Sequence, residues 1–134
     1  MAYAPVANIA NTRLAKLTPM ARVADVVRSI EWYSKLGFRA EGTWTPEGSP
    51  MQWATLRNGY AELMLVRAEK SVNRDAQGVL LYLYAHGVAQ YRDHLVAEGL
   101  KPGELEYPFY AKHGEFQIDD PDGYCLLVGD TEQQ

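Results

Sequence analysis

Eight residues of this 134-residue chain have side chains that could together hold a small organic molecule. Three are large aromatic residues, whose rings stack on planar molecules. The others are polar and could orient a ligand through hydrogen bonds or charge. The eight are Arg22, Trp53, Thr55, Tyr82, Tyr84, His113, Glu115 and Gln117. Because they are far apart in the sequence, they form a site only if the fold gathers them.

Metal and nucleophile chemistry have less support in the sequence. The histidines, His86, His94 and His113, do not have the spacing of a metal-binding motif. No Ser–His–Asp arrangement can be argued from spacing either. His113, in the loop before Gly114, is the best candidate for a functional histidine. The single cysteine, Cys125, is predicted on a buried strand as an inert apolar group.

The segment from Gly114 to Gly129 is predicted to be a strand, a tight turn and a second strand. Phe116 and Ile118 alternate with polar neighbours, which is the period of two typical of a half-buried strand. The turn is Asp120-Pro121-Asp122-Gly123. Its proline presets φ, its aspartates can bond nearby backbone N–H groups, and its glycine accepts a positive φ.

The same plan occurs earlier in the chain. Residues 51–66 are again strand, turn and strand, with Asn58-Gly59 as a strong hairpin signal. Other predicted strands cover residues 14–23, 38–44, 79–85 and 105–107.

Two helices complete the repeat. Asp25 offers an N-cap to a helix over residues 26–36, and residues 88–98 form the second helix. Gly37 and Gly99 follow the two helices and stop them. Superposing these glycines gives a shift of 62 residues (99 − 37) between the halves.

This internal repeat predicts an α+β domain made of two tandem βαβββ modules. The modules are residues 14–67 and 79–130, within a single domain over 14–130. We expect an N-terminal arm (1–13), a linker (68–78) and a C-terminal tail (131–134). The second hairpin turn is predicted to be two residues longer than the first, so that Leu63 corresponds to Leu127.

The helices must cover one face of each sheet. Ala54, Leu56, Leu81, Leu83, Phe116 and Ile118 are assigned to that face. The opposite face is predicted to carry the candidate residues except His113, together with Thr18, Leu63, Leu65, Leu80, Cys125 and Leu127. Such a mixture of aromatic, aliphatic and polar groups is typical of a small-molecule pocket. A second buried face, or a dimer interface without a ligand, is the alternative.

Composition narrows the possible partners. The net charge is −4 without a basic run, which argues against nucleic acid. One cysteine allows no internal disulfide and fits a reducing compartment, so we predict a cytoplasmic protein. No stretch approaches about 20 apolar residues, so no membrane span is predicted. Residues 1–11 have no basic start and no long apolar block, so no signal peptide is expected.

Three motifs carry a family resemblance: Arg22-Val-Ala-Asp-Val, Glu31-Trp-Tyr-Ser-Lys-Leu-Gly-Phe38 and Asp120-Pro-Asp-Gly-Tyr124. With them the chain, over about residues 14–130, resembles the vicinal oxygen chelate superfamily, the group of glyoxalases, bleomycin-resistance proteins and extradiol dioxygenases. The resemblance implies two βαβββ modules whose mixed sheet curls around a cleft, often in a dimer.

In metal-using members of this family, cleft-facing residues of the first and last strand of each module hold the metal. The corresponding residues here are predicted to be Thr18, Leu63, Leu80 and Leu127, which cannot hold a divalent cation. Glu62 would enter only if the register shifted by one residue, which moves side chains to the other face of a sheet. No metal and no cofactor are therefore predicted.

The chain most resembles the metal-free bleomycin-resistance proteins, in Lys16-Leu-Thr18, Gly114-Glu-Phe116 and an aliphatic final strand. The resemblance implies a homodimer that sequesters an aromatic or amphipathic molecule such as an antibiotic, without catalysis. The alternative is a lyase, isomerase or dioxygenase of the same superfamily that uses Glu115, His113 or Arg22 as acid–base groups. A dimeric interaction module without a ligand is a third hypothesis.

Overall fold

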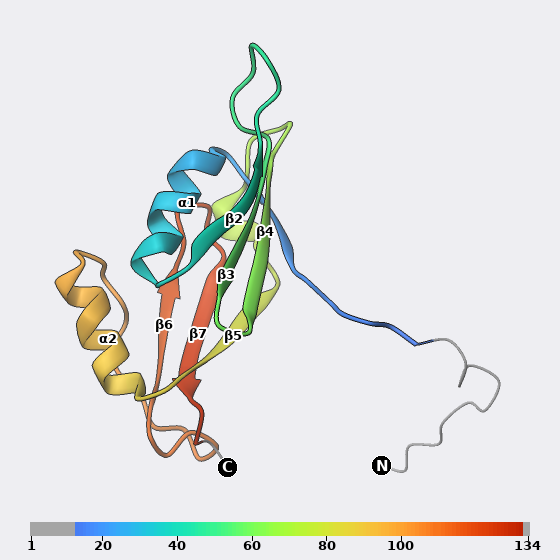
Figure 1. Ribbon diagram of the computed structural model, residues 1–134. Coiled ribbons are helices and arrows are strands. Elements are labelled where there is room, and N and C mark those ends of the chain that lie inside the picture. The colour runs from blue at the N-terminus through green and yellow to red at the C-terminus, as the bar shows by residue number, and fades with distance from the viewer. Residues whose placement is uncertain (1–12, 133–134) are drawn as a thin grey trace.

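The computed structural model describes residues 13–132 (Figure 1). Residues 1–12 of the predicted arm and 133–134 of the predicted tail lie outside the described residues. In chain order the elements are β1 (Met20–Val23), α1 (Val26–Lys35), β2 (Arg39–Trp44), β3 (Trp53–Asn58), β4 (Ala61–Arg67), the short 3-10 helix η2 (Arg74–Ala76), β5 (Leu80–Ala85), α2 (Val88–Ala97), β6 (Glu115–Asp119) and β7 (Cys125–Asp130). Neither helix of this described part is long and apolar enough to cross a membrane.

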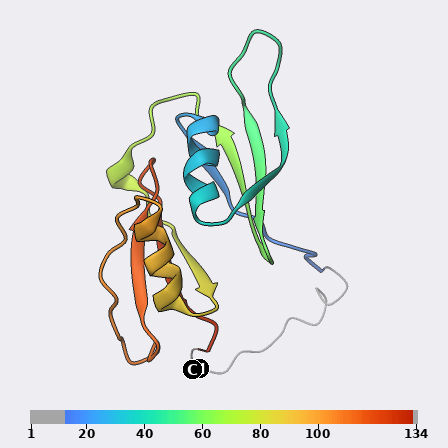
Figure 2. The same cartoon turned by 60° about the vertical axis from the view of Figure 1, so that its left-hand side comes forward.

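The strands form two mixed sheets with related topology. Their orders are β1-β4-β3-β2 and β5-β7-β6. In each sheet the first strand of the module runs parallel to the last one, and the other neighbours are antiparallel. One helix accompanies each sheet, and the two units lie side by side (Figure 2). The predicted α+β fold built from two related modules is confirmed.

Two predicted strands are shorter in the structure, because prolines limit their pairing. The strand predicted over residues 14–23 is confirmed only from Met20. Its ladder to β4 ends where the Pro19 carbonyl accepts from Met64 N, since proline has no N–H to continue it. The strand predicted over 105–107 is wrong as a strand. It is reduced to one bridge between Glu106 and Glu115, with prolines at both 102 and 108.

Helix α1 begins and ends as its sequence predicts. The carboxylate of Asp25 accepts a hydrogen bond from Arg28 N at 3.1 Å, which caps the first turn. Val26, Ser29 and Tyr33 are buried against the sheet. Gly37, with φ +98°, follows the end of the helix in a conformation that favours glycine.

Helix α2 is capped by a residue from another element. Gly87 at its N-terminus has no side chain to cap it. Instead the Asp130 carboxylate, at the end of β7, accepts from Val88 N at 3.0 Å. This backbone hydrogen bond lowers the pKa of Asp130. The start of α2 is thereby fixed to the last strand of its own sheet.

Both modules share one hydrophobic core, which corrects the predicted face of β4. In the first hairpin Leu56 pairs with Leu63 and Ala54 with Leu65, so all four side chains lie on the helix side. Leu63 and Leu65 are 4% and 0% exposed. Residues 58–61 separate Arg57 from Glu62, whereas residues 120–124 separate Asp119 from Cys125. The second turn is therefore one residue longer, not two, and Leu63 corresponds to Leu126.

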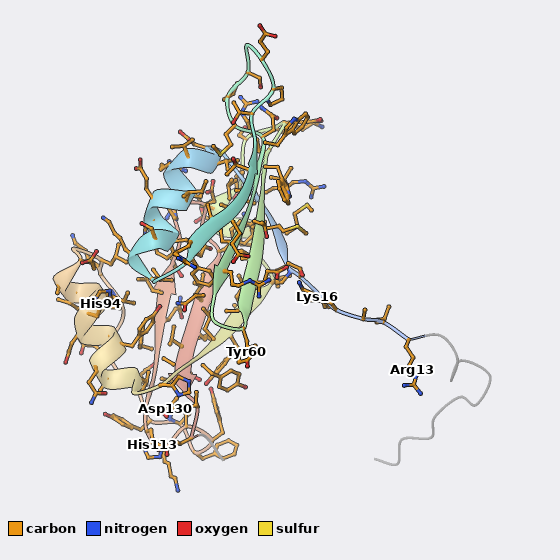
Figure 3. The ribbon with its side chains drawn as sticks, in the orientation of Figure 1. Arg13, Lys16, Tyr60, His94, His113 and Asp130 are labelled. Atoms are coloured by element: carbon orange, nitrogen blue, oxygen red, sulfur yellow. The ribbon has the colours of Figure 1, made fainter. Side chains whose placement is uncertain are left out.

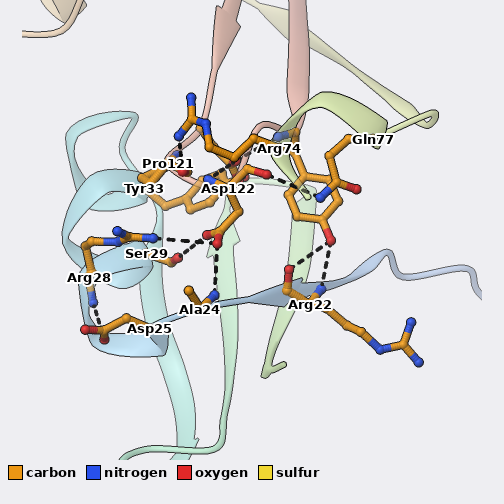
Figure 4. A network of polar contacts seen from close by, with 12 residues as sticks. Arg22, Ala24, Asp25, Arg28, Ser29, Tyr33, Arg74, Gln77, Pro121 and Asp122 are labelled. Carbon is orange, nitrogen blue, oxygen red and sulfur yellow. Dashed lines mark hydrogen bonds and ion pairs between the residues drawn. The ribbon is translucent and has the colours of Figure 1, made fainter. Parts of the chain in front are cut away.

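The Asp-Pro-Asp-Gly turn joins the second module to the first (Figure 4). The Asp122 carboxylate accepts from Ala24 N at 2.9 Å and lies 3.6 Å from the Arg28 guanidinium. Tyr33 donates its hydroxyl to Asp120 at 2.7 Å, and burial of this phenol raises its pKa far above the ordinary value. Both aspartates are almost fully buried. The turn is thus a structural joint as well as a reversal of the chain.

Tyr124 extends this joint to β1. Its hydroxyl accepts from Arg22 N at 3.1 Å and donates to Arg22 O at 2.9 Å. The edge strand of the first sheet is in this way tied to the start of the last strand of the second sheet.

Replacing Gly123 with alanine should lower the free energy of unfolding by about 1–3 kcal/mol. Its φ is +87°, and an added Cβ would lie 2.4 Å from the backbone oxygen of Arg74. Gly59→Ala is a matched control, because Gly59 also has a positive φ, +61°, but open space around it. Urea unfolding should show the larger loss for Gly123→Ala. Equal losses in both variants would mean that the contact with Arg74 is unimportant.

Asp120 should make stability depend on pH. Burial raises the pKa of this carboxyl, against the lowering effect of its hydrogen bond with Tyr33. A raised folded-state pKa gives stability that is present below the unfolded pKa of about 4 and is lost as pH rises through the folded pKa. Asp120→Asn removes this titration, so its stability relative to the wild type should increase from pH 4 to pH 7. Urea unfolding at both pH values checks this, and a constant or decreasing difference would contradict it.

Candidate functional site

Each sheet has an open face, which we define as the face turned away from its helix. On the first sheet the register places Trp53 opposite Val66 and Thr55 opposite Met64 on this face. On the second sheet Tyr82 lies beside Leu127, which pairs with Gln117. Several large side chains remain well exposed there: Met20, Leu80 and Tyr84 are 52%, 57% and 63% exposed.

The predicted site residues fall into two groups and one outlier. Arg22, Trp53 and Thr55 lie on the open face of the first sheet. Tyr82, Tyr84, Glu115 and Gln117 lie on the open face of the second sheet. His113 is in the loop before β6, where its Nε2 is 3.8 Å from the Glu132 carboxylate. It lies near Asp130, whose pKa it helps to lower (Figure 3). The structure thus gathers four of the eight on one sheet.

A carboxylate is the centre of the group on the second sheet. Glu115 Oε1 accepts a hydrogen bond from the Tyr82 hydroxyl at 2.8 Å. Its other oxygen, Oε2, accepts from the Tyr110 hydroxyl at 3.1 Å. Although Glu115 is only 8% exposed, no Lys, Arg or His among residues 13–132 forms an ion pair with it. Such a carboxylate is held by neutral donors and retains an unbalanced charge.

Two further aromatic rings contact the tyrosines that bind this carboxylate. Tyr82 and Tyr84 have ring centroids 5.1 Å apart, and Phe109 meets Tyr110 edge-on at 5.5 Å. Phe109 is 99% exposed. We call Tyr82, Tyr84, Phe109, Tyr110 and Glu115 the tyrosine–glutamate cluster. Its rings provide apolar surface beside a negative charge, a combination suited to a planar cation.

Tyr110 was not among the predicted site residues. It lies in the loop before β6, and only the fold returns that loop to the open face of β5. The one signal in the sequence was the pair Phe109-Tyr110, two aromatic residues in succession in a loop. The hydrogen bond to Glu115 raises the pKa of Tyr110, which keeps its hydroxyl protonated as a donor.

Glu62 lies on the open face of β4, to which Leu63 was wrongly assigned. It pairs with Arg57 across the hairpin. Its carboxylate binds Lys16 at 2.7 Å, Thr18 at 3.3 Å and also the Arg57 guanidinium. The hydrogen bond from Lys16, reinforced by the charges of Lys16 and Arg57, lowers the pKa of Glu62.

Whether a metal ion could bind in this chain depends on the residues at the family's metal-ligand positions. With the corrected register, Met64 corresponds to Leu127, so the strand positions that the resemblance assigns to ligands hold Thr18, Met64, Leu80 and Leu127. The two leucines offer no donor atom, and Glu62 on the same face is already neutralised by two cations. Within residues 13–132 no three His, Cys, Asp or Glu side chains are grouped so that they could hold a metal ion. The residues present do not fit a divalent cation.

Replacing Glu115 with glutamine should lower the pKa of Tyr110 toward its ordinary value, because the negative charge that opposes ionisation of the phenol is removed. Absorbance titration of the tyrosinates would show this as an earlier rise with pH. In a Tyr110→Phe background the same substitution should change the titration less. An identical change in both backgrounds would exclude Tyr110 as the responding group.

Comparison with known proteins gives the family and the fold. A family model described as the Glyoxalase/Bleomycin resistance protein/Dioxygenase superfamily matches residues 14–127. A search of the curated proteins found no match.

Three solved structures illustrate the shared fold. A bleomycin resistance determinant encoded on the transposon Tn5 has a TM-score of 0.70 and 18% identity, over 89% of this chain and 99% of that one. The bleomycin-binding protein of Streptomyces verticillus, complexed with copper(II)-bleomycin, has a TM-score of 0.67 and 17% identity, over 90% and 99%. A glyoxalase-related enzyme from Clostridium phytofermentans has a TM-score of 0.73 and 12% identity, over 90% and 98%. At these identities the similarity shows the fold alone.

Proposed function

Because this chain belongs to the Glyoxalase/Bleomycin resistance protein/Dioxygenase superfamily, we propose that it is a metal-free protein that binds a small aromatic or amphipathic molecule such as an antibiotic. A protein of the same fold from Streptomyces verticillus was solved with copper(II)-bleomycin bound. The tyrosine–glutamate cluster supports the proposal for this chain through its own chemistry.

The observation that carries the proposal is the buried carboxylate of Glu115 without a cationic partner in the described chain. A cation placed against it would balance the charge, and the two tyrosine hydroxyls already hold the carboxylate in a fixed orientation. The rings of Tyr84 and Phe109, which contact these two tyrosines, are exposed. We therefore propose a planar aromatic cation as the preferred ligand.

We also propose that two copies of the chain form the binding cleft. The open face of the second sheet carries exposed Leu80 and Tyr84, and a second copy would remove this apolar surface from water. A cleft between two chains would also bring a first sheet with Trp53 opposite a second sheet with the cluster. Sedimentation should accordingly show a dimer at micromolar concentration, and a monomer would contradict this part of the proposal.

Catalysis has less support in the geometry of one chain. The acid–base candidates Arg22, His113 and Glu115 lie on the first sheet, in the loop beside Glu132 and on the second sheet, respectively. They are not gathered around a common point. Binding without a chemical step is therefore the function that we propose.

Binding can be tested with ethidium, a fluorescent planar cation, and with bleomycin. Stacking contributes about 0.5–1.5 kcal/mol per ring pair beyond area burial, so two or three pairs with apolar burial give an expected Kd in the micromolar range. Tyr82→Ala and Trp53→Ala should each weaken binding. Elemental analysis of the same samples should find no stoichiometric transition metal.

The substitution Glu115→Gln tests the contribution of the carboxylate charge to binding, because it keeps a side chain of similar size. It should weaken ethidium binding about tenfold or more, because hydrogen-bonded charged groups contribute about 1.5–3 kcal/mol. Glu104→Gln, at an exposed loop position, removes the same charge elsewhere and should leave the affinity unchanged. If neither probe binds the wild type, or if both glutamine variants bind alike, the cluster is not the site. Stoichiometric zinc, nickel, manganese or iron would contradict the metal-free proposal.

A further inference from the structure

A groove of about 660 Å³ lies at the edge of the first sheet, away from the tyrosine–glutamate cluster. One wall is the end of β1 and β4, and the other is the segment from Arg67 to Gln77 that connects the two modules. Its volume is within the range of small-molecule sites. The sequence does not indicate this groove, because the connecting segment has no hydrophobic periodicity and is predicted only as a linker.

The charge of the groove is positive. Arg22, Arg67 and Lys70 line it, against one acid, Glu69. In residues 13–132 none of these three cations forms an ion pair. By contrast, Lys16, Arg28 and Arg57 are each matched with a carboxylate. In a chain of net charge −4, three unmatched cations around one hollow concentrate a local attraction for anions.

The remaining lining is largely apolar. Met20 of β1 and Val66 of β4 both lie on the open face, and Val72 contributes from the connecting segment. The Tyr124 ring closes one end. Its hydroxyl is occupied by the backbone of Arg22, so the ring itself is held in place. A ligand would thus meet cations and apolar surface in the same groove.

The connecting segment, which forms the outer wall of the groove, is anchored by hydrogen bonds to the last hairpin turn. Arg74 of η2 donates to the carbonyl of Pro121, and Gln77 donates to the carbonyl of Asp122 at 3.2 Å. Asn73 caps η2 by accepting from Asp75 N at 3.0 Å. Because both ends of η2 are held by the last hairpin turn, the groove is formed before a ligand arrives, which reduces the entropic cost of binding.

We infer that this groove binds an amphipathic anion, a small molecule with an apolar body and a carboxylate, sulfonate or phosphate group. The anionic group lies among Arg22, Arg67 and Lys70, and the apolar body lies on Met20, Val66 and the Tyr124 ring. The inference goes beyond the proposed function and does not depend on it. It concerns the groove between the first sheet and the connecting segment instead of the tyrosine–glutamate cluster, and it requires a ligand of opposite charge.

The test uses 8-anilinonaphthalene-1-sulfonate, a fluorescent amphipathic anion, with the full-length protein. The wild type should bind it saturably, and Arg22→Gln combined with Lys70→Gln should weaken binding about tenfold, as expected when two charges at a partly enclosed site are lost. Arg39→Gln combined with Lys101→Gln removes the same charge from exposed positions and should leave the affinity unchanged. Circular dichroism melting of all three proteins excludes dye binding to a loosened core.

The location of the anion-binding site is tested by amide NMR, with decanoate as a second anionic probe. Shifts should concentrate at residues 71–77 and at Arg22 and Tyr124, and they should diminish as salt screens the charges. The neutral dye N-phenyl-1-naphthylamine should bind both double variants alike. The inference is overturned if the sulfonate does not bind, if both double variants bind it as the wild type does, or if the shifts concentrate around Tyr82 and Glu115. The last result would place the anion at the cluster and would also contradict its preference for cations.

Discussion

The joint between Asp120, Asp122 and helix α1 is the interaction on which the rest of the structure depends. Two carboxylates at the tip of the last hairpin are inserted where the first module begins its helix, and they satisfy the backbone N–H of Ala24 and the hydroxyls of Ser29 and Tyr33. Buried carboxylates are costly unless their hydrogen bonds are complete. The described chain leaves no buried side-chain donor or acceptor unsatisfied. The two modules are therefore fixed relative to each other by polar geometry as well as by apolar contact.

This joint has a consequence for the surface. Because the helix sides of both sheets are buried in one core, the open faces remain available on the outside. The side chains on these faces are not required for the core, and they differ between the sheets. On the first sheet Glu62 is neutralised by Lys16 and Arg57, whereas on the second sheet the side-chain partners of Glu115 within residues 13–132 are tyrosine hydroxyls. The backbone repeats from one module to the other, whereas the chemistry of the two open faces differs.

The same joint forms the basic groove at the edge of the first sheet. Gly123 allows the backbone of Arg74 to approach closely, and this contact brings the connecting segment against the last hairpin turn. The segment then stands as a wall beside Arg22. A turn that links the modules thus also places three cations around a hollow, opposite in charge to the tyrosine–glutamate cluster.

Local patterns in the sequence determined much of the fold. The N-cap Asp25, the stop at Gly37 and the positive φ of Gly123 depend on neighbouring residues alone, and each was predicted correctly. The repeat and the family followed from them. The alternation of Phe116 and Ile118 was also sufficient to assign the helix side of β6.

Only the tertiary structure determined the features that depend on pairing between distant residues, namely the faces of the strands and the contacts of loops. The pairing of Asn58 with Ala61 across the hairpin turn determines which side chains of β4 face the helix. The predicted register was wrong by one residue, so Leu63 was assigned to the open face and Glu62 was not. The contact of Tyr110 with Glu115 and the approach of the connecting segment to Tyr124 are likewise absent from any local pattern. Side-chain period fixes which residues share a face, but only the register between strands fixes which face that is.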